Sequence, residues 1–354
     1  MKETKFTHQI TVGFPVYNVE DYVYNSLLSV LNQDFDSYEV VVVDDCGSDK
    51  SMDIIRNLIS THPSGRKVRI IKHSQNKGLA EARNTTIKNA MSKYIFFLDS
   101  DDYLSSNALS ILYKAAEKNK TDIVIGSNYK TDGKRIWSDN DDVFPYTLFE
   151  NGEFAEYYYG NISDIMPATV WNILFNMEFL KKNNLLFPSI RFQEDIAFDE
   201  LYYPCIQRAL LIPNKTYYYM IRANSLMNHQ SRDLIDISEA KRAIDICKLL
   251  KSYCTLRKNN SFYGGLCAKT LKICFYEVTG IIKHRHRFNG DISDRAIKNM
   301  IKHPESFISI LKFKQLKKYN FFYFFLGILP PKICVIIIRF ICMRKRYNII
   351  HNRN

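Results

Sequence analysis

Short apolar runs alternate with amphipathic segments along the first third of the chain. The apolar runs predict strands at 10–14, 39–43, 68–72, 94–98 and 122–126. The run Glu-Val-Val-Val-Val at 39–43 is typical of a parallel strand that is buried on both faces. Helical spacing lies between these runs at 22–31, 51–59 and 79–90. Strands that alternate with helices predict an α/β fold with a parallel sheet.

The pattern changes after residue 126. Residues 127–165 are rich in Asp, Asn and Tyr, as in a variable loop region, and helical spacing returns at 170–180 and 196–210. Amphipathic helices are expected at 237–259 and 264–285, so the last third of the chain should be mostly helical. We therefore expect one domain over 1–230, a helical region over 231–311 and a separate tail over 312–354.

The tail combines apolar and basic segments. Two apolar stretches, 321–329 and 333–343, are separated by Pro330-Pro331 and flanked by basic residues at 312–318 and 344–346. Each stretch is shorter than the ~20 apolar residues of a spanning helix, and the prolines interrupt helical hydrogen bonding. We favour an in-plane or re-entrant anchor on an anionic membrane surface. The alternative is a buried pair of helices or an oligomer contact.

Charge and cysteine usage narrow the expected cellular location and the expected partners. The net charge of the 354-residue chain is +12, and basic proteins often meet nucleic acid, anionic lipid or phosphorylated ligands. The basic clusters flank the apolar tail, which favours a membrane surface and predicts no nucleic-acid partner. Eight cysteines lack the spacing of a zinc site or a disulfide framework, and no signal-peptide pattern opens the chain. We expect a cytoplasmic protein, peripheral on the inner face of the cell membrane.

Polar segments follow three of the predicted strands. Pro15 to Asn18 follows the first, Asp44-Asp45 the second, and Asp99-Ser100-Asp101-Asp102 the fourth. Ligands of such sheets bind beyond the carboxyl ends of the strands, so these segments should converge on one crevice. The Asp-x-Asp carboxylates suit Mg²⁺ or Mn²⁺ beside a diphosphate. Considered alone, the motif fits an acidic turn before the next helix equally well.

Two further segments could contact a nucleoside. Asp44 can accept hydrogen bonds from a base or ribose, although such an acid also suits a helix N-terminus. Gly78 suits a tight turn, and Asn76 and Arg83 could reach a base or ribose from the loop and the helix beside it. The alternative is an ordinary loop before a solvated helix.

Together and in this order, the segments resemble the nucleotide-binding half of family 2 glycosyltransferases. That family's fingerprint is similar to Pro-Val-Tyr-Asn, Val-Asp-Asp-Gly-Ser-x-Asp, Asn-x-Gly-x-x-x-Ala-Arg-Asn and Leu-Asp-x-Asp-Asp. The chain departs from it at Cys46-Gly47, where the family usually has Gly directly after the acids. The resemblance is close over 10–103 and looser to about 230. It implies a GT-A fold, with a Rossmann-like nucleotide-binding sheet and a mostly helical C-terminal region.

The resemblance also implies roles for individual residues. Asp195 of Glu194-Asp195 inherits the part of catalytic base, where the residues alone would indicate only helix N-terminal charge. Asp101, assisted by Asp99, would hold Mn²⁺ or Mg²⁺, and His229 is a further possible ligand that stays open. The implied donor-binding residues are Pro15, Tyr17, Asp44, Asn76, Arg83, Asp99, Ser100, Arg222 and Ser225.

The expected function is transfer of a sugar, with inversion, from a nucleotide-sugar donor to a glycan or lipid-linked acceptor. UDP donors are the commonest for such sites, and the setting would be bacterial cell-surface polysaccharide synthesis. A non-catalytic nucleotide-sugar- or glycan-binding relative is the alternative. A dinucleotide-dependent oxidoreductase is excluded, because no Gly-x-Gly-x-x-Gly follows the first strand. A phospho-receiver is disfavoured, because its acids would follow the first strand.

Overall fold

The computed structural model describes residues 6–137, 143–163, 170–221 and 234–351. Arg222, Ser225 and His229 therefore lie outside the described residues. The chain divides into two compact units. The first is built from Met1–Phe154 and Ala168–Leu226, and the second from Ala155–Pro167 and Met227–Asn354.

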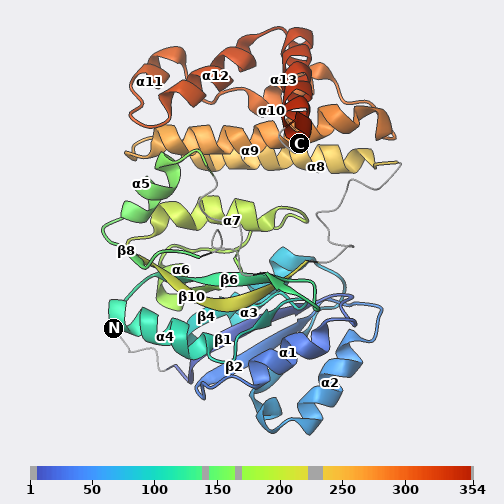
Figure 1. Ribbon diagram of the computed structural model, residues 1–354, viewed down its shortest axis with the longest axis vertical. Helices are drawn as coiled ribbons and strands as arrows, with labels where there is room; N and C mark the ends of the chain where they lie inside the picture. Colours follow the sequence, from blue (N-terminus) through green and yellow to red (C-terminus); the bar gives the residue numbers. More distant parts are fainter. Residues whose placement is uncertain (1–5, 138–142, 164–169, 222–233, 352–354) are drawn as a thin grey trace. The chain divides into compact units, whose positions relative to one another are not determined.

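The first unit is organised around one mixed sheet (Figure 1). Its strands run in the order β3-β2-β1-β4-β9-β6-β10-β5, and the first four are parallel to one another. β9 is antiparallel to β4 and β6, while β10 runs parallel to β6. The strands are β1 (His8–Val16), β2 (Tyr38–Asp44), β3 (Val68–Lys72), β4 (Ser92–Phe97), β5 (Tyr103–Leu104), β6 (Ile123–Thr131), β9 (Ile173–Asn176) and β10 (Ala209–Met220). Two short strands, β7 (Ile136–Trp137) and β8 (Thr147–Phe149), pair with β6 and β10.

Helices connect the parallel strands, as the hydrophobic pattern predicts. They are α1 (Val23–Leu31), α2 (Ser51–Thr61), α3 (Leu79–Asn89) and α4 (Ala108–Asn119). β2 is buried along its whole length, because its valines pack on both faces of the sheet. α1 and α4 bury their apolar faces in the main core beside Phe14 and Phe96, and Ala82 of α3 packs against Val41 and Val43 on the other face. The α/β expectation is confirmed.

The expected helix over 170–180 is wrong in its first half. Residues 173–176 form strand β9, and only Met177–Lys182 form helix α6. Asn172 explains the difference: its backbone is left-handed, with φ 58°, and its buried side chain binds across the sheet. Its amide donates to the carbonyls of Gly126 and Ser127, and its oxygen accepts from Thr216. The predicted helix over 196–210 is shorter, α7 (Glu194–Tyr202), and is followed by β10.

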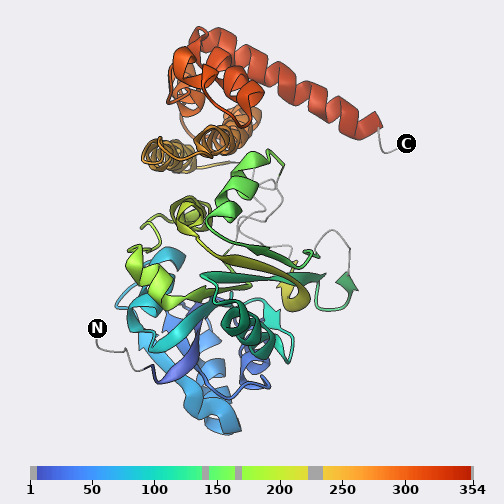
Figure 2. The same ribbon diagram turned by 90° about the vertical axis from the view of Figure 1, so that its left-hand side faces the viewer.

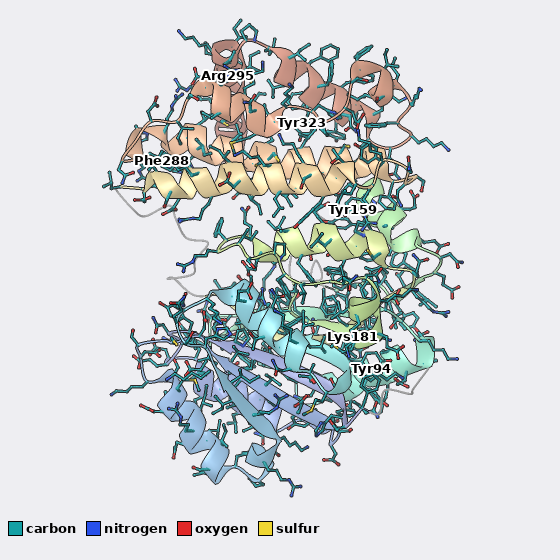
Figure 3. The ribbon with its side chains drawn as sticks, turned by 180° about the vertical axis from the view of Figure 1, so that it is seen from behind. Tyr94, Tyr159, Lys181, Phe288, Arg295 and Tyr323 are labelled. Carbon is teal, nitrogen blue, oxygen red and sulfur yellow. The ribbon has the colours of Figure 1, made fainter. Side chains whose placement is uncertain are left out.

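The second unit is helical, as the amphipathic pattern predicts. α8 (Ile237–Thr255) and α9 (Tyr263–His284) pack on each other, and α10 (Asp294–Ile301) packs on both. The shorter helices α11 (Phe307–Leu311) and α5 (Glu153–Gly160) are the other α-helices described in this unit before the tail. Figure 3 labels Tyr323 of α12 (Lys317–Ile328), a buried side chain whose ring lies 6.0 Å from that of Phe275 on α9. The chain's cysteines, which include the facing Cys254 and Cys267, are all free thiols.

The tail forms two helices within this unit. α12 ends at Ile328 and α13 (Pro331–His351) begins at the second proline, so the predicted interruption is confirmed. Both helices pack against α9 and α10 through one face each. Figure 2 shows α13 as the long C-terminal helix of this unit. Within the described residues, no helix has the length and apolar character needed to cross a membrane.

Candidate active site

The strand ends of the first unit bring the predicted polar segments to one edge of the sheet. β1 lies between β2 and β4, all three parallel. Asp44 is the last residue of β2, and Asp99 to Asp102 follow β4. Pro15 is buried within β1, opposite Val43, whereas Tyr17 just beyond it is half exposed. Tyr17 can therefore contact a ligand with its side chain, and Pro15 shapes the strand beneath it.

The turn after β2 contains Cys46-Gly47, the two residues that depart from the family pattern. Cys46 adopts a left-handed backbone, with φ 58°, and its N–H donates to the buried Asp44 carboxylate over 3.0 Å. Asn18 accepts from the N–H of Ser48 over 2.8 Å. A Cβ on Gly47 would lie 2.9 Å from the Asn18 Oδ1 and 3.0 Å from its backbone nitrogen. These contacts hold the turn against the loop after β1.

A polar pocket opens beside this turn. Val16, Asn18, Asp44 and Gly47 line one part of it, and the remaining lining comes from the turn, α2 and the end of β3, namely Cys46, Asp49, Ser51, Met52, Asp53, Arg56 and Lys72. Carboxylates can accept hydrogen bonds from base and ribose donors, and cationic side chains suit phosphate oxygens. The pocket therefore has the chemistry to hold part of a nucleotide.

Asp45 is a site residue whose separate role the sequence did not indicate. Its side chain is buried and accepts hydrogen bonds from the backbone N–H groups of Lys77 and Gly78, each over 2.8 Å. His73 Nδ1 lies 2.7 Å from the same carboxylate, and its Nε2 lies 2.9 Å from the Thr85 hydroxyl. Asp45 thus holds the loop between β3 and α3. The sequence did contain a signal for this difference: successive residues of an extended chain point in opposite directions, so Asp44 and Asp45 should face different surroundings.

The predicted nucleoside ligands Asn76 and Arg83 lie in different surroundings. Asn76 is partly buried on that loop, and its amide lies 3.4 Å from the Asp45 carbonyl. Arg83 is almost fully buried, so it is not the solvated helix residue of the alternative interpretation. Its guanidinium donates to Asp99 over 2.8 Å and to Glu194 over 2.9 Å.

The Arg83 bridge joins two parts of the site that are far apart in sequence. Asp99 belongs to the expected metal motif, and Glu194 belongs to the pair that contains the expected base. Burial acts to lower the pKa of the Arg83 guanidinium, but the carboxylates of Asp99, Glu194 and Asp195 outweigh it and raise that pKa. Arg83 therefore stays charged and fixes both acidic segments.

Asp195 stands in the first turn of α7 and accepts a hydrogen bond from the N–H of Ile196 over 2.8 Å. Burial raises the pKa of its carboxyl to about 7, and repulsion from Glu194 adds to the rise. Arg83 and the Ile196 hydrogen bond act in the opposite direction. A carboxylate whose pKa lies near neutrality can accept a proton from a hydroxyl and later release it.

Asp102 and Tyr217 connect the acidic loop to β10. Asp102 is buried and accepts from the Tyr217 hydroxyl and from the N–H of Met220, both over 2.7 Å. The Tyr217 oxygen also accepts from the Asp99 N–H over 3.3 Å. Burial, with Asp101 and Asp99 beside it, holds the pKa of Asp102 well above its usual value. Asp102 therefore serves the structure of the loop, a role that its place in the motif did not reveal.

The donor set fits a hard divalent cation. Ser100 is buried between Asp99 and Asp101, whose own side chains are partly exposed. Across the described ranges, no three His, Cys, Asp or Glu side chains are grouped so that they could hold a metal ion. Mg²⁺ commonly binds one or two carboxylates and completes its shell with waters and phosphate oxygens. Asp99 and Asp101 can supply that number.

This fold and these residues define a class of protein. The mixed sheet has acidic residues at the ends of parallel strands, and Arg83 joins the Asp-x-Asp loop to the Glu-Asp start of α7, an arrangement that suits a GT-A glycosyltransferase. The family model described as "Glycosyl transferase family 2" matches residues 11–180. The chain belongs to glycosyltransferase family 2.

Curated relatives agree with the family. The uncharacterized glycosyltransferase EpsJ of Bacillus subtilis is 31% identical over 61% of this chain and 62% of its own length. An uncharacterized glycosyltransferase of Haemophilus influenzae is 31% identical over 53% of this chain and 69% of its own. The poly(ribitol-phosphate) beta-glucosyltransferase of Bacillus spizizenii is 29% identical over 60% of this chain, but only 32% of its own length is matched. The chain thus spans less than two thirds of the length of several relatives that it matches.

Solved structures share the fold. Staphylococcus aureus TarS 1-349 in complex with UDP-GlcNAc superposes with a TM-score of 0.67 at 19% identity, covering 90% of this chain and 89% of that one. The mannosyltransferase PcManGT from Pyrobaculum calidifontis, in complex with GDP-Man and Mn²⁺, gives a TM-score of 0.51 at 14% identity, covering 94% and 87%. The GT-A architecture is therefore confirmed.

Proposed function

We propose that this glycosyltransferase moves a sugar from a UDP-sugar to a hydroxyl of a glycan or lipid-linked acceptor, with inversion at the anomeric carbon. The observation that carries the proposal is the Arg83 bridge, which ties the Asp-x-Asp loop to the start of α7. Donor and acceptor chemistry need fixed geometry with respect to each other. The UDP preference is supported by TarS, a structure of the same fold solved with UDP-GlcNAc.

The roles follow from the position of each group. Asp44 and Tyr17 would contact the nucleoside beside the pocket, while Asp45 fixes the loop that carries Asn76. Asp101, assisted by Asp99, would hold Mg²⁺ or Mn²⁺, which would supply positive charge next to the departing diphosphate. Arg222 and Ser225 are proposed to contact the same phosphates. Ser100, between Asp99 and Asp101, would be the donor-binding residue of the Asp-x-Asp loop.

Asp195 would take the proton of the acceptor hydroxyl as that oxygen attacks the anomeric carbon. In this single displacement, the new oxygen–carbon bond forms while the bond from the anomeric carbon to the diphosphate oxygen breaks. The proton goes to the Asp195 carboxylate, and the nucleoside diphosphate leaves with the electron pair. Attack from the side opposite the diphosphate produces inversion.

We further propose that the acceptor belongs to bacterial cell-surface polysaccharide synthesis and that the enzyme works at the cytoplasmic face of the membrane. Relatives named as poly(ribitol-phosphate) glycosyltransferases support the polymer part of this proposal. The second unit supports the membrane part, because its C-terminal helices carry many exposed apolar side chains.

The test is a screen of UDP-, GDP- and dTDP-sugars with Mn²⁺ or Mg²⁺, in which the released nucleotide is measured. We expect turnover of a UDP-sugar that EDTA abolishes. Asp101→Ala should lose metal-dependent turnover while it remains folded. Asp245→Asn, a change at an exposed carboxylate of α8, is the control and should keep full activity. Full turnover of Asp101→Ala, or of the wild type in EDTA, would contradict the metal role.

A further inference from the structure

The C-terminal helices of the second unit differ from ordinary surface helices, because large apolar side chains lie on their exposed side as well as on their buried side. The inner face of α12 buries Tyr323 and Leu326, and that of α13 buries Cys334, Val335 and Ile338. A helix on a water-exposed surface normally turns charged or polar residues to solvent. Helices that are apolar all round are buried in protein or lie in a membrane environment.

The outer face of α12 repeats at helical spacing. Lys318, Phe322, Phe325 and Ile328 are all exposed and follow one another at intervals of four and three residues. They therefore form a single stripe along the solvent side of the helix. Phe325 is 51% exposed and Ile328 56%. The stripe begins with a cationic side chain and continues with apolar ones.

α13 repeats the arrangement. Ile333, Ile336, Phe340 and Met343 form an exposed stripe at the same spacing, and the exposed fraction of Ile336 reaches 64%. Lys332 and Arg339 are exposed on the same helix, next to this stripe. Contiguous exposed apolar surface that is bordered by polar groups marks an interaction site.

The charge of this segment identifies the kind of partner. Residues 306–354 contain ten Lys and Arg residues and no Asp or Glu. This stretch therefore supplies most of the chain's net charge of +12. An apolar stripe with basic neighbours and no acidic residue is complementary to a surface with an apolar interior and anionic headgroups. A second copy of this segment would instead bring like charges together.

We propose that the outer stripes of α12 and α13 dock on an anionic bilayer, with their apolar side chains inserted at the level of the headgroups. The helices remain folded on α9 and α10 through their inner faces. This deepens the proposed membrane location by naming the surface responsible, and it does not depend on the sugar-transfer chemistry. The docking is shallow, since neither helix is long and apolar enough to span.

The experiment is co-sedimentation of the full chain with vesicles of equal parts phosphatidylcholine and phosphatidylglycerol, and with vesicles of phosphatidylcholine alone. We expect binding to the anionic vesicles, much weaker binding to the neutral ones, and partial release at high salt. High salt screens the charges but leaves the apolar insertion. Equal binding to both vesicles, or no binding to either, would overturn the proposal.

Paired variants locate the surface. Ile336→Ser combined with Phe340→Ser should weaken vesicle binding at least about tenfold without lowering thermal stability, because both side chains are already exposed. Leu256→Ser combined with Tyr276→Ser removes exposed apolar groups elsewhere in the same unit and should bind as the wild type does. The proposal fails if the two double variants bind alike.

A third comparison separates charge from other effects. Lys317→Gln with Lys318→Gln should reduce binding to anionic vesicles, whereas Lys241→Gln with Lys248→Gln, on exposed positions of α8, should not. Analytical ultracentrifugation tests whether a second copy of the chain covers the stripes instead. The proposal is overturned if the wild type is a stable dimer that does not bind vesicles and if Ile336→Ser with Phe340→Ser makes it a monomer. The stripes would then be a subunit interface.

Nucleotide release from a soluble UDP-sugar is measured in the same samples. The Ile336→Ser and Phe340→Ser variant should retain it, because the catalytic acids lie in the first unit. Vesicle binding without turnover would count against the proposed chemistry alone. Turnover without vesicle binding would count against the docking surface alone.

Discussion

Asp195 carries the chemical proposal at the scale of single residues. Its surroundings combine burial with repulsion from Glu194 and Asp99, partly offset by Arg83, and Asp199 one helical turn further on is a second buried carboxyl. Burial holds the pKa of Asp199 well above its usual range, and repulsion from Asp195 and Glu200 adds to the rise. The sequence predicted the base by resemblance, but its environment depends on Arg83, more than a hundred residues earlier in the chain.

The first prediction concerns pH. A general base acts in its deprotonated form, and the pKa of Asp195 is raised to about 7. The rate of transfer should therefore rise by about tenfold per pH unit on the acidic side and level off above pH 7. The measurement is kcat/KM for transfer across the pH range, with nucleotide binding as a control. A flat profile between pH 5 and 8 would argue against Asp195 as the base.

The second prediction concerns Arg83. Arg83→Gln leaves Asp99 and Glu194 without their shared cation in a largely buried site. We expect the free energy of unfolding to fall by roughly 3–5 kcal/mol, as when one partner of a buried ion pair is removed. Urea unfolding measures it. Arg56→Gln, which breaks an exposed pair with Asp53, is the matched control and should cost about 0–1 kcal/mol. Similar losses in both variants would contradict the structural role of the bridge.

At the scale of elements, local pattern predicted most of the sheet. The buried valine run of β2 and the apolar runs of β1 and β4 specify strands whatever lies beside them. The pattern failed at β9, where Asn172 turns the chain through hydrogen bonds to Gly126 and Thr216. Those partners lie more than forty residues away, so no window of local sequence contains them.

The third prediction concerns the turn after β2. Gly47→Ala would bring its Cβ within 3.0 Å of the Asn18 backbone nitrogen, which cannot move without shifting the loop after β1. Such crowding costs about 1–3 kcal/mol. Because this turn lines the pocket, we expect weaker nucleotide binding by calorimetry. Gly280→Ala, which meets no atom within 4 Å on α9, is the control. Unchanged affinity in Gly47→Ala would show that the turn does not shape the nucleotide site.

At the scale of the whole molecule, the sequence predicted an α/β half followed by a helical half, and the two compact units agree with that order. For the tail, the sequence favoured a membrane anchor over a buried pair of helices. Its helices have features of both: Asn320 is fully buried and bonds to His303 and to the Gly264 carbonyl, while neighbouring phenylalanines face solvent. When a helix has apolar side chains on both sides, the elements that pack against it decide which side is buried, and here these elements are α9 and α10.

The fourth prediction concerns removal of this tail. Deleting residues 312–354 takes away Tyr323, Leu326 and Ile338, which are buried within the second unit. Each fully buried apolar side chain contributes roughly 1.5–3 kcal/mol, so we expect a clearly lower Tm by circular dichroism. The vesicle-binding variant at Ile336 and Phe340 should melt as the wild type does. A truncated chain that melts like the full one would mean that the tail does not help to cover α9 and α10.

The most direct test of the central claim is the rate of sugar transfer by Asp195→Asn, measured together with its affinity for the donor. The substitution keeps the shape of the side chain and removes the proton acceptor. We predict a loss of transfer of about 10²–10⁴-fold, with nucleotide-sugar binding close to that of the wild type and of the control Asp245→Asn. If Asp195→Asn transfers sugar normally while Glu194→Gln is inactive, Asp195 is not the base, and the proposed mechanism is contradicted.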